Sequence, residues 1–130
     1  MSSPKIEIAL DPGPWTEPEF ALHWPCRGRV SGRVCVETFE RITPRAVRVS
    51  VGWRTEGRGD EDSEILLEET LHTGELPIGR REFPFAVQLP EAPISYVGNY
   101  IKIVWQVAAH IDLAWKRDPK DIKTFFVTLP

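Results

Sequence analysis

Three acidic residues at alternate positions are the first feature of this sequence that could bind an ion. Asp60, Asp62 and Glu64 have the spacing with which the ligands of a calcium-binding loop begin. Such a loop then needs a glycine at its sharp turn and a bidentate acid at its end, but these positions hold Ile65 and Leu71. The segment therefore predicts a solvated acidic loop, and we expect no calcium site.

The glycines before this loop do not complete a phosphate-binding motif. Gly57 and Gly59 match the first two glycines of a dinucleotide fingerprint, whose third glycine position is Asp62 here. No helical pattern follows, so no helix N-terminus is available to hold a phosphate. We expect the chain to bind no nucleotide cofactor, and no other cofactor is indicated.

The three histidines are candidates for a metal site or for acid–base catalysis. His23, His72 and His110 fall on three different predicted strands, and no two are spaced to lie side by side on one strand. A shared site would require His110 and Asp112 to converge with His72 across neighbouring strands. That convergence would support the alternative function, a small-ligand-binding or metal-dependent enzyme with its site on the β-sandwich. Our expectation is that the chain has no catalytic, cofactor-binding or metal-binding residues.

The cysteine content argues against both a disulfide framework and a nucleophilic enzyme. Cys26 and Cys35 are the only two cysteines, which is too few for a disulfide scaffold or a four-cysteine zinc site. Neither belongs to a Cys-x-x-Cys pair, and the sequence has no Gly-x-Ser-x-Gly nucleophile motif. We therefore expect free thiols, with Cys35 partly exposed on a strand face that it shares with Arg33 and Glu37, and no enzymatic activity.

Arginines at alternate positions suggest recognition of an acidic or phosphorylated peptide. Arg29 and Arg33 share one face of a predicted strand, and Arg48 and Arg54 share one face of the next. If these two strands pair, their guanidinium groups form a positive stripe, and guanidinium groups bind phosphate and carboxylate well. The alternative is an ordinary sheet face on which Glu37 and neighbouring acids balance the arginines.

The tryptophans divide into core and surface candidates. Trp53, Trp105 and Trp115 fall in the apolar phase of their segments, which predicts burial. Trp15 follows a Pro-Gly-Pro turn instead, and we expect it to cover a sheet edge or lie in an interface. The candidate partner-binding residues are Arg33, Arg48, Arg54 and Trp15.

The elements that position these side chains are predicted by alternation of apolar and polar residues. Alternation is strictest from Tyr100 to Trp115, where a period of two indicates a long, half-buried strand and excludes a helix. Further strands are predicted at 6–10, 20–24, 30–36, 47–53, 83–89 and 125–129.

Two segments are expected at sheet edges. Pro84 interrupts the strand at 83–89, and because proline has no N–H to donate, that strand must lie at an edge or be bulged. Residues 64–73 alternate poorly, which also indicates an edge or bulged strand. About eight short strands without an amphipathic helix predict an all-β fold, an antiparallel two-sheet β-sandwich, with a closed barrel as the alternative.

Composition limits the class of protein and its partners. The chain has 130 residues, 42% hydrophobic and 27% charged, which fits one domain over residues 1–130 and excludes a disordered chain. Its net charge of −3 gives no general attraction to nucleic acid. No apolar run is long enough to span a membrane and the N-terminus has no signal-peptide pattern, so we expect a cytoplasmic protein.

The order of several short motifs resembles the arrestin-like superfamily. Trp24–Val34 is similar to the turn and V-x-G-x-V strand of arrestin-like domains. Phe83-Pro84-Phe85, Leu89-Pro90 and Ser95-Tyr96-Val97-Gly98 follow in order and lead into the long strand that contains Ile103-Val104-Trp105. This series resembles the bacterial sporulation-control branch of the superfamily, and its motifs are those of the N-terminal type of domain.

The resemblance implies an immunoglobulin-like β-sandwich that acts as a noncatalytic adaptor or protein-interaction module. Members of the superfamily usually pair an N-terminal with a C-terminal sandwich, so a second copy or another protein would supply the missing lobe. We expect a protein partner, bound through a sheet edge or the loops at one end, and no nucleic acid and no membrane insertion. An exposed edge strand at 64–73 also predicts a defined or weak homodimer.

Overall fold

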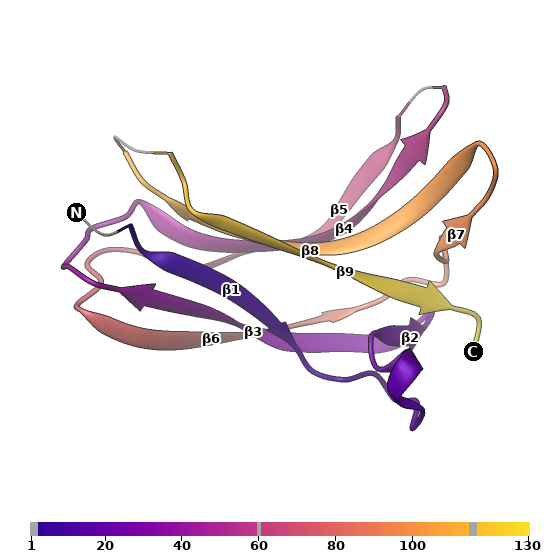
Figure 1. Cartoon of the computed structure of the whole chain (residues 1–130), viewed down its shortest axis with the longest axis horizontal. Helices are drawn as coiled ribbons and strands as arrows, with labels where there is room; N and C mark the ends of the chain where they lie inside the picture. Colours follow the sequence, from indigo (N-terminus) through magenta and orange to yellow (C-terminus); the bar gives the residue numbers. More distant parts are fainter. Residues whose placement is uncertain (1–2, 60, 115–116) are drawn as a thin grey trace.

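The protein is an all-β sandwich of two packed sheets. The structure is a computed structural model, and it describes residues 3–59, 61–114 and 117–130. Figure 1 shows a three-stranded sheet below a six-stranded sheet, with the short helix η1 (Pro18–Phe20) at the right-hand end. The predicted fold class, a two-sheet arrestin-like sandwich, is confirmed, and the closed barrel is not formed.

The smaller sheet has the strand order β1-β3-β6 and is antiparallel throughout. It contains β1 (Lys5–Leu10), β3 (Arg29–Thr38) and β6 (Gly79–Gln88). Alternation in β3 directs Val30, Val34 and Val36 into the core, while Arg29 and Arg33 face solvent. The expected strands at 6–10, 30–36 and 83–89 are therefore present.

The larger sheet has the strand order β2-β9-β8-β4-β5, and the short strand β7 pairs with β8 outside this order. These strands are β2 (His23–Pro25), β9 (Lys120–Thr128), β8 (Ile101–Asp112), β4 (Ala46–Gly57), β5 (Ser63–His72) and β7 (Tyr96–Val97). β2 runs parallel to β9, whereas the other strand pairs of this sheet are antiparallel. The predicted strand at 20–24 is replaced by η1 and the three-residue β2, because Pro18 begins a helical turn there.

The core lies between the two sheets and is built from the inward phase of each strand. Trp105 on β8 is fully buried, as predicted, and its ring packs against Phe125 on β9 with 5.9 Å between ring centroids. The ring of Trp24 also meets Phe125 edge-on, with 5.6 Å between ring centroids. Trp53 is only half-buried against the core, and Trp115 lies outside the described residues.

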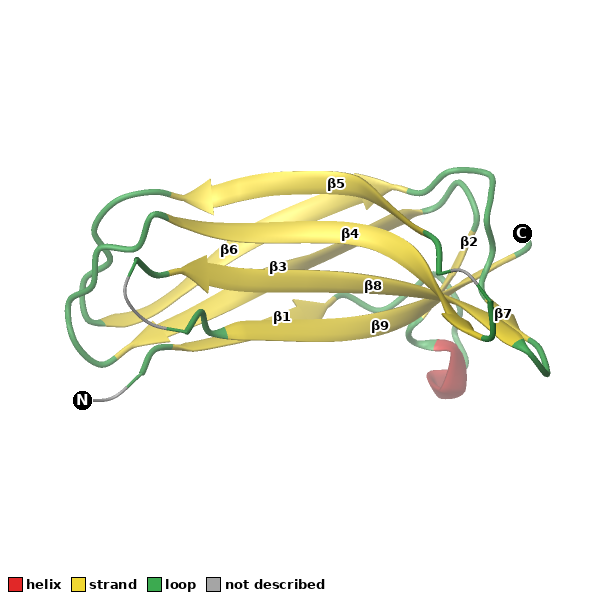
Figure 2. Ribbon diagram, turned by 90° about the horizontal axis from the view of Figure 1, so that it is seen from above, coloured by secondary structure: helices red, strands yellow, loops and turns green. Residues whose placement is uncertain are grey.

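The two strands expected at edges are edge strands. β6, which carries Pro84, ends the smaller sheet, and β5 ends the larger one. Figure 2 shows β5 along one long side of the molecule and β6 crossing beneath β4. The pairing of β5 with β4 shifts register at Val47/Arg48 and at Val51/Gly52, which explains its poor alternation. Gly52 is required at the second shift, because a Cβ there would lie 2.2 Å from the carbonyl oxygen of Glu64.

Candidate functional site

The loop at 93–95 and the strand β7 lie between β8 and the end of β9 in the larger sheet, and we call them the wedge. The backbone amide of Ser95 donates to the carbonyl of Val127 at 2.8 Å, and the Ser95 hydroxyl accepts from the amide of Val127 at 2.8 Å. The indole Nε1 of the buried Trp105 donates to the carbonyl of Pro93 at 3.1 Å. β7 follows directly and pairs with β8. These bonds hold the sheet open at this end, and Figure 1 shows β7 between the ends of β8 and β9.

A groove follows the outer side of this wedge. Its volume is about 290 Å³, and the apolar residues that line it include Val104 on β8, Phe126 on β9 and Tyr96 and Val97 on β7. Charged side chains, among them Arg54 and Lys102, line it as well. The groove thus presents aromatic and aliphatic surface to solvent at one end of the sandwich.

A chain of aromatic side chains continues from the groove to the underside of the same end. Phe126 stacks on His23 with 4.7 Å between ring centroids, and Phe20 meets His23 edge-on at 5.1 Å. Trp15, Phe20 and His23 line a second hollow of about 300 Å³. Trp15, Phe20 and Phe126 are nevertheless 38%, 42% and 44% exposed.

The β7–β8 hairpin adds a second group of exposed side chains beyond the groove. Tyr96 and Val97 are 52% and 72% exposed, and Tyr100 and Ile101 at the turn are 68% and 39% exposed. The carbonyl of Tyr100 accepts from the amide of Arg58, whose guanidinium lies 5.7 Å from the Tyr100 ring centre, so this turn is held against the β4–β5 turn.

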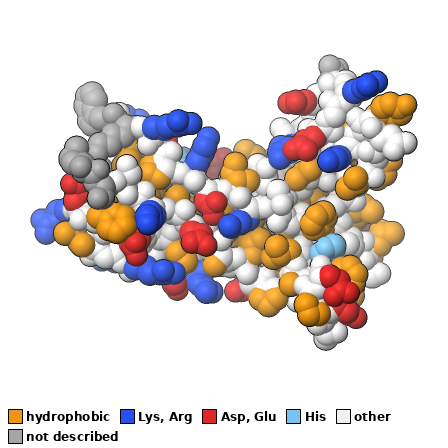
Figure 3. Space-filling view, in the orientation of Figure 1, with side chains coloured by type: hydrophobic (Ala, Val, Ile, Leu, Met, Phe, Trp, Pro, Cys, Tyr) orange, Lys and Arg blue, Asp and Glu red, His pale blue; other side chains and the backbone are white. Residues whose placement is uncertain are grey.

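We refer to these exposed side chains together as the apolar end surface. It consists of Trp15, Phe20, Leu22, Tyr96, Val97, Tyr100, Ile101 and Phe126. Figure 3 shows hydrophobic side chains gathered at the right-hand end of the molecule, over η1, β7 and the end of β9. Exposed apolar groups that adjoin one another in this way are typical of binding surfaces, whereas singly scattered ones are ordinary.

The arginine stripe does not form. It required β3 to pair with β4, but β3 pairs with β1 and β6, whereas β4 pairs with β5 and β8 in the other sheet. Arg33 and Arg48 therefore face solvent from opposite sides of the sandwich. Of the predicted partner-binding residues, the structure brings Arg54 and Trp15 to the two hollows of the same end.

Each of these arginines has acidic neighbours. Arg33 lies 3.5 Å from Glu82 and 3.9 Å from Asp11. Arg48 donates to the Asp112 carboxylate at 2.9 Å. Arg54 pairs with Glu56 and donates from Nε to the Gln106 side chain at 3.0 Å. The arrangement is the mixed-charge surface that was the alternative to a positive stripe.

The histidines do not converge. His72 pairs with the fully buried Val47 and its ring lies 5.8 Å from Phe83, so it points between the sheets. His110 pairs with Arg48 and points to the outer face. The alternative that required His72 to converge with His110 and Asp112 is therefore wrong, because neighbouring positions of β4 alternate between the two faces. Within the described ranges, no three His, Cys, Asp or Glu side chains could jointly hold a metal ion.

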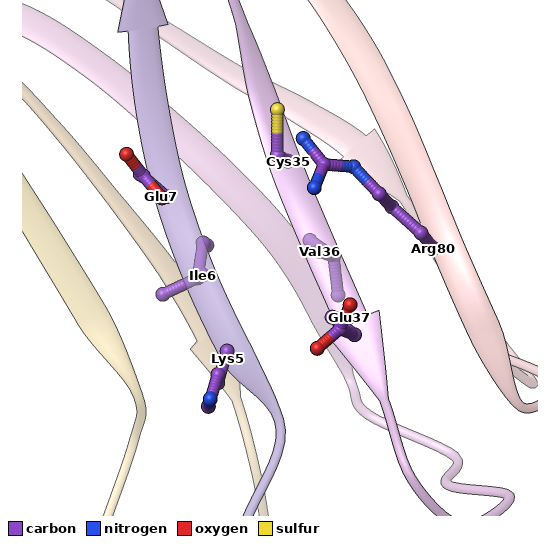
Figure 4. A pocket seen from close by; sticks show the side chains of 7 residues that line it. All are labelled: Lys5, Ile6, Glu7, Cys35, Val36, Glu37 and Arg80. Carbon is purple, nitrogen blue, oxygen red and sulfur yellow. The ribbon is translucent and has the colours of Figure 1, made fainter.

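Cys35 lies in a small charged hollow of about 80 Å³ on the outer face of the smaller sheet (Figure 4). It is buried, not partly exposed as predicted, because the register places it between Glu7 on β1 and Glu82 on β6. Arg80 reaches across from β6, and its hydrogen bond to the Cys35 side chain, together with the nearby Glu82, raises the pKa of Arg80. The Cys35 thiol is thus covered by an ionic network; Cys26 is buried in the core.

Sequence reasoning missed most of the apolar end surface. Phe126 and Ile122 occupy the outward phase of β9, where a half-buried strand normally carries polar residues. Large apolar residues in the polar phase of a strand were the available signal. The exposure of Phe20 and Leu22 could not be predicted in the same way, because their segment is not a strand.

Comparison with known proteins places the chain in a family. Its structure resembles the crystal structure of Spo0M, a sporulation control protein from Bacillus subtilis, with a TM-score of 0.71 and 17% sequence identity. The similarity covers all of this chain and 51% of the Spo0M chain, so this chain spans about half the length of that protein. At this identity the likeness concerns the fold.

Two further findings complete the comparison. The sequence matches no curated protein significantly. In the part of the chain that the structure describes, no helix is long and apolar enough to cross a membrane. The family model for "Arrestin (or S-antigen), N-terminal domain" matches residues 60–130, which is more than half of the chain. The chain therefore belongs to the family of arrestin N-terminal domains.

Proposed function

We propose that this chain is a noncatalytic protein-interaction module of the arrestin-like type, in which residues 1–130 act as one domain. The observation that carries the proposal is the apolar end surface, which joins two hollows of about 290 and 300 Å³ through the Phe126–His23–Phe20 contacts. Aromatic anchors beside hollows are the usual centres of protein interfaces. The partner is a protein with apolar side chains that fill these hollows.

The surrounding residues support this use of the surface. Arg54 and Lys102 line the groove beside its apolar residues, and polar contacts next to apolar ones are common in interfaces. The wedge bonds of Ser95 and Trp105 fix the groove walls to the core. A preformed groove loses little conformational entropy on binding. We place the module in the cytoplasm, where its surface would meet a protein partner.

The test compares two charge insertions on exposed apolar residues. Phe126→Asp changes the centre of the apolar end surface, and Ile78→Asp changes a 68% exposed side chain outside it. We expect a partner captured from the native cells, and then purified, to bind the wild type and Ile78→Asp equally and Phe126→Asp at least tenfold more weakly. Equal binding by all three forms, or substrate turnover by the wild type in a broad hydrolase screen, would overturn the proposal.

We also propose weak self-association through an exposed strand. β5 is an edge strand, and such strands recruit partners, while its glutamates oppose indiscriminate pairing. Light scattering over a hundredfold concentration range should show a mass that rises above the 14.8 kDa of one chain. A constant mass of one chain at all concentrations would contradict the homodimer.

A further inference from the structure

The free edge of β5 is a second surface with binding capacity, separate from the apolar end surface. β5 pairs only with β4, and Figure 2 shows it along one long side with no described element beyond it. Its central residues Glu68, Glu69 and Thr70 are exposed. Between the two register shifts, Leu67–Thr70 pairs with β4 without interruption. An edge strand of this kind presents unpaired backbone N–H and C=O groups to an incoming strand.

The other long edges offer less to a partner strand. On β6, Pro84 lacks an N–H in the middle of the strand. On β1, the Asp121 carboxylate accepts from the backbone amide of Ile8 at 2.8 Å, so this edge amide is already bonded. Among the described strands longer than three residues, β5 therefore has the least obstructed edge.

Adjacent glutamates on β5 determine which strand can pair there. Glu68 pairs with Ser50, which lies on the outer face of the sheet, and Glu69 pairs with the buried Val49, so its carboxylate points toward the inner face at the margin of the sandwich. Neither carboxylate forms an ion pair with any residue that the structure describes. An added strand must therefore place one positive charge on each of its faces, which requires two consecutive basic residues.

We infer that the β5 edge binds an extended segment of a partner protein that carries two adjacent Lys or Arg residues, by adding it as a strand to the larger sheet. Backbone hydrogen bonds to Leu67–Thr70 would supply the pairing, and the basic pair opposite Glu68 and Glu69 would supply the choice of partner. A β5 strand from a second copy would place like charges opposite one another, so self-association through this edge is weak and a basic segment binds there more tightly. The inference rests on the proposed function only in that both assign protein binding to the chain.

The experiment uses the full chain and three fluorescent peptides. The first is acetyl-Ser-Val-Thr-Lys-Lys-Val-Thr-Ser-amide; the second replaces Lys-Lys by Glu-Glu; the third keeps Lys-Lys but carries N-methyl groups on alternate backbone amides. We expect the first to bind in fluorescence anisotropy, with NMR shift changes centred on the amides of Leu67–Thr70, and the other two to bind at least tenfold more weakly. Equal binding of the N-methylated peptide would show simple charge attraction and overturn strand addition.

Charge reversal provides the matched test on the protein. E68K/E69K should weaken binding of the Lys-Lys peptide about tenfold and confer binding of the Glu-Glu peptide, because both cross-strand pairs change sign. E17K/E19K makes the same change in net charge on exposed glutamates away from β5 and should leave both peptides unaffected. No change with E68K/E69K, or an equal change with E17K/E19K, would overturn the inference.

One more variant separates this inference from the proposed function. Phe126→Asp alters the apolar end surface and leaves β5 intact, so it should bind the Lys-Lys peptide as the wild type does. If Phe126→Asp loses a protein partner but keeps the peptide, the two surfaces act independently. If the wild type binds no Lys-Lys peptide while the partner still requires Phe126, the inference fails and the proposed function stands.

Discussion

The Asp121 carboxylate on β9 accepts a hydrogen bond from the backbone amide of Ile8 on β1, with 2.8 Å between the amide nitrogen and Oδ2. β1 belongs to the smaller sheet and β9 to the larger one, so this bond joins the two sheets. In Figure 2, β1 and β9 lie near one another on the long side opposite β5. One side of the sandwich is thus held by a hydrogen bond between the sheets, and the other carries the edge strand β5.

Removal of this carboxylate should lower the stability of the fold. Asp121→Ala leaves the amide of Ile8 without its acceptor, and we expect the free energy of unfolding to fall by about 1–3 kcal/mol. Urea denaturation followed by circular dichroism measures this change. Asp121→Asn keeps a side-chain oxygen, so its free energy of unfolding should fall less. Lys123→Ala changes an exposed position on the same strand and should lower the free energy of unfolding by about 0.5 kcal/mol at most. Equal losses for Asp121→Ala and Lys123→Ala would contradict this role.

Addition of a single methyl group at Gly52 should disturb the β4–β5 pairing. The new Cβ would lie 2.2 Å from the Glu64 carbonyl oxygen, and this contact is with backbone that cannot rotate away. We expect Gly52→Ala to cost about 1–3 kcal/mol, as overpacking does. Ser50→Ala, two residues earlier on the same face, is the matched control in thermal denaturation. Similar melting temperatures for the two variants would show that the bulge adapts without cost.

Two ion pairs of equal length should differ in energy because they differ in exposure. Arg48–Asp112 and Arg27–Glu91 both have N–O distances of 2.9 Å, but the side chains are 36% and 19% exposed in the first pair and 67% and 75% in the second. We expect double-mutant cycles to give a coupling of about 1 kcal/mol for the first and under about 0.5 kcal/mol for the second. A stronger coupling in the exposed pair would contradict this order.

The indole of Trp105 should contribute to both packing and the wedge. Trp105→Phe removes the hydrogen bond to Pro93 and leaves space beside Phe125, so we expect a loss of about 1–3 kcal/mol in the free energy of unfolding. Trp15→Phe, at an exposed position, is the control and should lose much less. Far-UV circular dichroism in urea follows both variants without reliance on tryptophan emission. A loss for Trp15→Phe as large as that for Trp105→Phe would contradict this assignment.

Much of the fold could be predicted because local patterns determine which face of a strand is buried. The strict alternation around Trp105 predicted β8, and its inward positions from Trp105 to Ile111 form the core. Pro84 predicted an edge strand, because a strand with neighbours on both sides uses all its backbone N–H groups in hydrogen bonds and proline has none to donate. The register shifts in β5 appeared in the sequence as lost alternation over 64–73.

The errors have a common cause. Alternation shows which side chains of a strand are buried, but it does not show which strands lie beside that strand. β3 and β4 follow one another in the chain, yet the connection between them crosses from one sheet to the other, so Arg33 and Arg48 are separated by the core. Likewise the end carrying Trp15 and Phe126 is assembled from segments more than 100 residues apart, through the parallel pairing of His23 with Phe126. Only the three-dimensional arrangement brings these residues together.

The pairing of β2 with β9 also has a consequence for how the chain folds during synthesis. His23 pairs with Phe126, so the segment around His23 must wait for one made much later before the larger sheet is complete. Trp24, a core residue, would meanwhile lack Phe125, its partner from β9. Pairing between such distant segments slows folding and leaves apolar surface uncovered for longer. A nascent chain whose β9 has not yet left the ribosome is therefore the form most in need of a chaperone. Ribosome-stalled chains that end before residue 120 should be the most sensitive to protease.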